Sequence, residues 1–131
     1  MMIRLLMILV LMPAASLADD AMSVEQFRAY AEGKTLYFAQ KGAPYGIEQY
    51  QKDQHSVWQY SDGTCAKAVW HSRKNLICFV YEGTSEEICW SFFMNGDQVS
   101  ARALGADPAD DLIVIWRDDR PIMCKAPGVG T

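Results

Sequence analysis

Four cysteines are the residues of this chain whose types and spacing most directly imply chemistry. Cys65, Cys78, Cys89 and Cys124 form an even set in a chain of 131 residues, and none of them belongs to a C-x-x-C pair of the kind found in redox dithiols. In a small exported domain, such a set is typical of two structural disulfides. Three pairings are open on spacing alone.

The two histidines, His55 and His71, are the next candidates, as metal ligands or as a general base. They fall on different expected strands with no ligand spacing between them, and a zinc site completed by cysteines would require reduced thiols. The chain has no C-x-x-C-H or G-x-S-x-G motif. We therefore expect no metal, no cofactor and no catalytic residues. The alternative is a small periplasmic hydrolase with His55 or His71 as its base.

Aromatic and polar side chains gather around one segment rich in glycine and proline. Tyr45, Glu48 and Tyr50 stand close together there, and Trp58 and Tyr60 lie on the next expected strand. Aromatic rings with a few polar groups are the usual lining of small-molecule pockets. The prediction is that these five residues line the mouth of a barrel and contact a ligand. The alternative is that they simply fill a small β core and its rim.

These side chains need a scaffold, and turn signals divide most of the chain into short runs. Ser23 and Gln26 have the spacing of a capping box, which predicts a helix over 24–32 that ends at Gly33. A loop is expected over Lys41–Gly46, because glycine and proline interrupt strand pairing. Strands are predicted over 35–39, 47–51, 55–60, 64–70, 76–81, 88–94, 98–104 and 112–116. The expected fold is mainly β, with one short N-terminal helix and then an antiparallel meander of about eight strands that forms a small barrel or half-barrel.

The hairpin turns predict which residues face one another. A two-residue turn at Asn95-Gly96 would place Phe92 opposite Val99, and a symmetric loop over 82–87 would place Cys78 opposite Cys89. Directly opposed residues approach closely enough for a disulfide. We therefore predict Cys78–Cys89, which leaves Cys65–Cys124 to tie the tail to the sheet. This register gives an apolar face that we expect on the core side: Ile77, Phe79, Ile88, Trp90, Phe92, Val99 and Ala101.

The first eighteen residues have the three parts of a secretory signal. Arg4 precedes an apolar run, Pro13 interrupts that run, and Ser16 and Ala18 occupy the small-x-small cleavage positions. We expect 1–18 to be a signal peptide and 19–131 to form a single β domain that is periplasmic or secreted. The apolar run is too short to span a bilayer, so stable membrane insertion after processing is not expected.

The net charge of the chain and the distribution of its basic residues limit the kinds of partner that we expect. The formal net charge is −4, and lysines and arginines are scattered along the chain. A nucleic-acid site requires a basic stripe that displaces counterions from phosphates, so no nucleic-acid partner is expected. The predicted function is a non-enzymatic binding or interaction module of the cell envelope, with a small ligand or an envelope protein as partner. A purely structural envelope component is the further alternative.

Several segments together resemble a family of small exported, periplasmic proteins of alphaproteobacteria that carries no assigned activity. They are Gly33-Lys34-Thr35-Leu36-Tyr37, Pro44-Tyr45-Gly46-Ile47-Glu48-Gln49-Tyr50, Asp62-Gly63-Thr64-Cys65, Ile77-Cys78-Phe79-Val80-Tyr81-Glu82, Cys89-Trp90, and Cys124 with Gly128-Val129-Gly130. The resemblance implies a periplasmic setting and no catalytic residue.

A second likeness is to periplasmic inhibitors of C-type lysozyme, which are small disulfide-bonded β-barrels with a Tyr-x-Cys-Asp-Gly element. In this chain Cys65 follows Asp62-Gly63 instead of preceding it, so the likeness is one of size and class. Fold analogy alone does not establish function. A lysozyme-inhibitor-like protein is therefore kept as an alternative.

Overall fold

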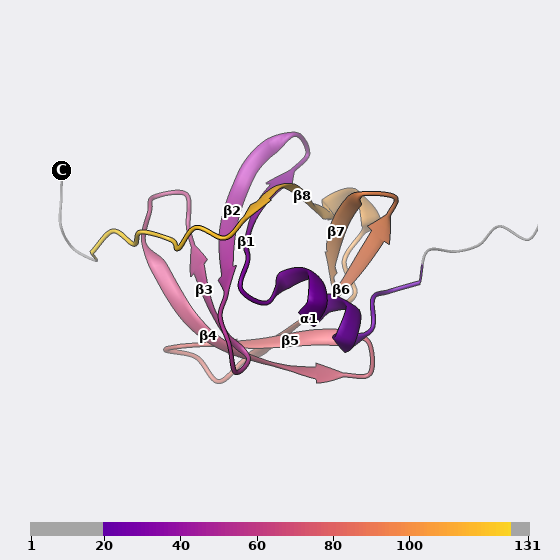
Figure 1. The fold of residues 1–131 in the computed structure, drawn as a ribbon, viewed down its shortest axis with the longest axis horizontal. Helices are drawn as coiled ribbons and strands as arrows, with labels where there is room; N and C mark the ends of the chain where they lie inside the picture. Colours follow the sequence, from indigo (N-terminus) through magenta and orange to yellow (C-terminus); the bar gives the residue numbers. More distant parts are fainter. Residues whose placement is uncertain (1–19, 127–131) are drawn as a thin grey trace, which may run out of the picture.

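The computed structural model describes residues 20–126, so the predicted signal peptide at 1–18 and the tail at 127–131 lie outside the described residues. Eight antiparallel strands form a closed barrel in which each strand pairs with its neighbours in sequence and β1 pairs with β8 (Figure 1). The prediction of a mainly β fold with one short helix is confirmed. Closure pairs the edges that an open sheet would leave exposed.

The elements have the following bounds along the chain: α1 (Val24–Ala31), β1 (Thr35–Gln40), β2 (Ala43–Tyr50), β3 (His55–Gln59), β4 (Cys65–Arg73), β5 (Leu76–Tyr81), β6 (Glu87–Asn95), β7 (Gln98–Ala103), the 3-10 helix η1 (Pro108–Asp110) and β8 (Leu112–Asp118). All eight predicted strands are present, within a few residues of the predicted ends.

The loop predicted over Lys41–Gly46 is wrong. Gln40 pairs with Ala43, so Lys41 and Gly42 alone form the turn, both with positive φ. Strand β2 then runs through Pro44, and the β1–β2 register shifts there as in a β-bulge. Proline is tolerated because β3 pairs with β2 only over residues 47–50, so the missing N–H breaks no bond to β3.

The helix closes one end of the barrel. Ser23 Oγ accepts from the Gln26 backbone N–H while Gln26 Oε1 accepts from the Ser23 N–H, which confirms the predicted capping box. Phe27 is fully buried, and its ring packs against the inward-facing rings of Tyr50, Trp70 and Phe92. Figure 1 shows α1 lying across the ring of strands. The helix therefore contributes to the core mainly through one aromatic side chain.

The register of β5, β6 and β7 is as predicted in one hairpin and displaced in the other. Cys78 lies opposite Cys89, as expected. In the next hairpin Asn95 pairs with Gln98, so Phe92 faces Ala101 and not Val99. Gly96, with φ +61, occupies the first central position of the turn, a place that favours glycine.

This displacement does not change which side chains point inward, because side chains alternate with a period of two and the register differs by two. Most of the predicted core face is buried: Ile77, Phe79, Phe92, Val99 and Ala101. Trp90 is partly buried against this core, whereas Ile88 is 43% exposed.

Both predicted disulfides are present, Cys65–Cys124 and Cys78–Cys89. The first holds the C-terminal strap, residues 119–126, against the outside of the barrel, where it passes β1, β2 and β3 (Figure 1). Four hydrogen bonds anchor the strap: Thr35 Oγ1 to Arg120 O, Ile122 N to Gln49 Oε1, Gln59 Nε2 to Met123 O, and Lys125 N to Gly63 O. The strap thus supports the strands that carry Glu48 and Trp58.

Candidate binding cavity

The interior of the barrel contains a cavity of about 290 Å³ whose lining is mostly aromatic. Its deeper wall includes Phe79, Phe92 and Ala101, which are buried, and its rim includes Tyr45 and Tyr60, which are 43% and 50% exposed. The rim residues stand at the hairpin ends opposite α1, because successive hairpins alternate between the two ends of an up-and-down barrel. The cavity is therefore open at one end and closed by Phe27 and its neighbours at the other.

The five residues predicted to bind a ligand, Tyr45, Glu48, Tyr50, Trp58 and Tyr60, all line this cavity. Strand pairing explains the arrangement, since Glu48 lies opposite Trp58 and Tyr50 lies opposite Ser56, and opposed residues of an antiparallel pair share a face. The two deeper residues, Glu48 and Tyr50, are almost fully buried. The structure thus brings the set together, and its role in binding stays a prediction.

Sequence reasoning missed the far wall of the cavity, which comes from β5 and β6. Tyr81 and Trp90 line this far wall; sequence reasoning also missed Phe38 on β1, which lines the cavity beside Trp58. A signal was present for Tyr81, because it lies two residues after Phe79, which was placed on the core side. Its proximity to Glu48 was not visible in the sequence, since it follows from the curvature of the closed barrel.

Glu48 is the polar centre of the cavity. Its side chain is 1% exposed, and Tyr81 Oη donates toward its carboxyl group from 3.2 Å to Oε1 and 3.3 Å to Oε2. Burial raises the pKa of Glu48 to about 8, and hydrogen bonding by hydroxyl groups offsets only part of this effect. At neutral pH the carboxyl group of the empty cavity is therefore mostly protonated.

Besides the hydroxyl group of Tyr81, those of Tyr50 and Ser56 lie near this carboxyl group. Burial, together with the nearby Glu48, raises the pKa of Tyr50 and of Tyr81, so both phenols stay neutral and keep their protons. Ser56 is buried on the same inward face, yet its Oγ has no hydrogen-bond partner among residues 20–126. We therefore take Tyr81 as the firmer hydrogen-bond partner of Glu48.

Trp58 forms the aromatic wall near the rim. Its ring centroid lies 6.1 Å from that of Phe38, 5.8 Å from that of Tyr45 and 6.5 Å from that of Tyr60. Gly46 permits this packing, because a Cβ at that position would overlap the indole ring. The glycine is required here for close approach, and its position on a strand fits that use.

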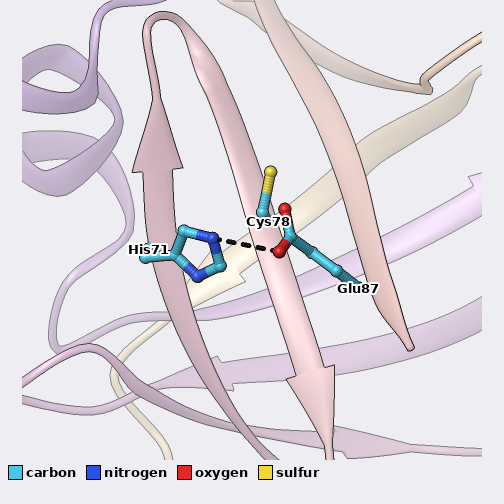
Figure 2. A group of neighbouring side chains, drawn as sticks. All are labelled: His71, Cys78 and Glu87. Atoms are coloured by element: carbon cyan, nitrogen blue, oxygen red, sulfur yellow. Dashed lines mark ion pairs between the residues drawn. The ribbon is translucent and has the colours of Figure 1, made fainter. Parts of the chain in front are cut away.

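A second group of chemically capable side chains lies away from the cavity, on β4, β5 and β6. Figure 2 shows His71, Cys78 and Glu87 together, with His71 Nε2 at 3.3 Å from Glu87 Oε2. Arg73 also pairs with Glu87. The Cys78 sulfur is bonded to Cys89, so it is not a thiolate that a metal could use. Neither His71 nor His55 lines the cavity.

Comparison of the chain with protein-family models, with curated proteins and with solved structures finds no match. The site is therefore interpreted from its own geometry. Among residues 20–126, no helix has the length and apolar character needed to cross a membrane.

Proposed function

We propose that this chain is a non-enzymatic, exported binding module that takes a small and mostly apolar molecule into the interior of its barrel. The observation that carries the proposal is an open, aromatic-lined cavity with one buried carboxyl group, Glu48, among its walls. Small-molecule sites are typically concave, largely apolar, and contain few polar groups that orient the ligand. A volume of about 290 Å³ is close to the lower end of the range for such sites, about 300 to 1,000 Å³, so the ligand is compact.

The scaffold supports this function because it holds the cavity open before a ligand arrives. The barrel is closed by β1–β8 pairing, and two disulfides cross-link it. A preformed site does not have to order its side chains and loops on binding, which lowers the free-energy cost of association. The arrangement therefore favours a binding protein over a module that folds around its partner.

The proposal also includes the cellular compartment, which is outside the cytoplasm. Two disulfides are typical of proteins that leave the reducing cytoplasm, the leader at 1–18 has the pattern of a secretory signal, and the resemblance to exported alphaproteobacterial proteins implies the periplasm. The hydrolase alternative gains no support from the cavity, because His55 and His71 both lie away from it.

The proposal is tested with benzyl alcohol, a small neutral aromatic probe, followed by ¹H–¹⁵N NMR of the processed protein. We expect saturable shifts concentrated in the cavity-lining strands. Ala101→Leu, which adds volume at a buried wall position, should abolish them. The matched control Ala29→Leu, at an exposed position on α1, should leave them unchanged. Shifts that persist in Ala101→Leu, or no saturable binding of benzyl alcohol or of a charged probe built on the same ring to the unmodified chain, would overturn the proposal.

A further inference from the structure

We infer that the ligand of this cavity is an organic cation, a compact amine or quaternary ammonium compound whose positive group lies against Glu48 and the surrounding aromatic rings. The inference rests on the proposed function and specifies the chemical class of the ligand. Three features of the cavity carry it: a buried carboxyl group without an ion-pair partner among residues 20–126, a lining rich in aromatic rings, and the lack of a basic residue in the described lining.

The first feature is that Glu48 has no positive partner of its own. The four ion pairs found among residues 20–126 all lie elsewhere. A buried carboxylate is stable only when it is paired or fully hydrogen-bonded. The side chains that face it are neutral: Leu36 from β1, Ser56 and Trp58 from β3, Tyr81 from β5, and Tyr50 from its own strand. Among residues 20–126 only its own proton neutralises this carboxyl group, and a cationic ligand can take the place of that proton.

The second feature is the aromatic wall. Tyr45 and Tyr60 at the rim each pack against Trp58, and Phe79 stacks on Tyr81 on the far side with centroids 6.1 Å apart. The face of an aromatic ring carries negative charge density and attracts ammonium groups, most strongly for tryptophan. Rings and carboxylate therefore favour the same sign of charge on a ligand.

The third feature argues against the opposite charge. The cavity lining contains no lysine, arginine or histidine among the described residues. An anionic ligand, such as a fatty acid or a phosphate ester, would lose its hydration without gaining a positive partner, and it would also approach a carboxyl group. The lining chemistry thus discriminates among ligand classes that the cavity volume alone would admit.

Proton linkage follows from the same geometry. Burial raises the pKa of Glu48 to about 8, so a cation that pairs with the carboxylate must displace its proton below that pH. Tyr50 and Tyr81, whose pKa values burial also raises, stay neutral, so Glu48 is the group that titrates. At pH 6 about one carboxyl group in a hundred is ionised, and the apparent affinity for a permanent cation should be about 100-fold weaker than its limit at high pH.

The experiment compares three probes built on one ring: benzyltrimethylammonium, whose charge does not depend on pH, benzyl alcohol and phenylacetate. Affinities are measured by calorimetry at pH 6 and pH 9 for the unmodified chain, for Glu48→Gln, and for the control Glu86→Gln in the exposed loop after β5. At pH 9 we expect the cation to bind at least about tenfold more tightly than the alcohol, with phenylacetate weakest. Glu48→Gln should remove the pH dependence and most of the preference, leaving only the part that the aromatic rings contribute, and Glu86→Gln should keep both.

The possible outcomes distinguish a failure of this inference from a failure of the proposed binding function. If benzyl alcohol binds in the cavity but the cation is no tighter at pH 9, the ligand class is wrong and the binding function stands. If no probe binds in the cavity, the proposed function itself fails. A pH dependence that persists in Glu48→Gln would also overturn the inference. If Glu48→Gln does not fold, the unmodified chain still tests the inference, because a cation affinity that does not weaken between pH 9 and pH 6 would overturn it.

Discussion

Replacing Glu48 by glutamine should remove part of the pH dependence of the free energy of unfolding. The folded state holds the Glu48 proton more tightly than the unfolded state does, because burial raises the pKa from 4.5 to about 8. The free energy of unfolding therefore falls as pH rises from about 4.5 to about 8, and it levels off above that range. At about 1.4 kcal/mol per pKa unit, the full loss is about 5 kcal/mol. Glutamine carries no proton to lose and can still accept from Tyr81.

The assay is urea denaturation at pH 5, 7 and 9 with both disulfides intact, comparing the unmodified chain, Glu48→Gln and the exposed control Glu86→Gln. The unmodified chain and the control should lose stability together as pH rises. Glu48→Gln should lose about 4 kcal/mol less between pH 5 and pH 9, because part of the full effect has already occurred at pH 5, so the two curves converge or cross toward alkaline pH. Parallel curves for Glu48→Gln and the unmodified chain would show that the carboxyl group is not held protonated by burial, and would refute the reasoning.

Three other substitutions probe the scaffold. Gly46→Ala should force the Trp58 ring out of its place, lower the free energy of unfolding by about 1 to 3 kcal/mol, and weaken benzyl alcohol binding in the same calorimetric assay. Removing the Cys65–Cys124 bridge by double serine substitution opens a link across 59 positions of sequence, and should cost about 4 kcal/mol and expose the strap to limited proteolysis. Phe27→Ala should cost about 3 to 5 kcal/mol, read from urea midpoints; a smaller loss would mean that α1 contributes little to the core.

Much of the scaffold was predictable because its signals are local. The capping box at Ser23 and Gln26 depends on residues three apart, and the Cys78–Cys89 pairing follows from one short hairpin. The segment 41–46 was misjudged for a reason that lies elsewhere in the chain. Its proline is tolerated only because β3 does not extend that far along β2. The residues of β2 alone do not indicate how far β3 pairs with it.

The candidate site was predictable in part for a similar reason. Clustering of aromatic residues between positions 45 and 60 identified one wall of the cavity. The depth of Glu48 and its contact with Tyr81, 33 positions away along the chain, come from barrel closure. The register predicted from a turn at Asn95-Gly96 is wrong by two residues, which altered the cross-strand partners but kept the inward face.

The placement of Phe27 beneath Tyr50 has a kinetic consequence. Under the proposed function, a ligand that enters at the end of the barrel that carries Tyr45 and Tyr60 must leave by the same end, because α1 and Phe27 close the other end. Since the cavity volume is only about 290 Å³, two compact ligands would then compete for the same space. Substitutions at Tyr45 or Tyr60 should then change both the rates of entry and exit and the charge preference, because these rings stand at the open end and belong to the aromatic lining.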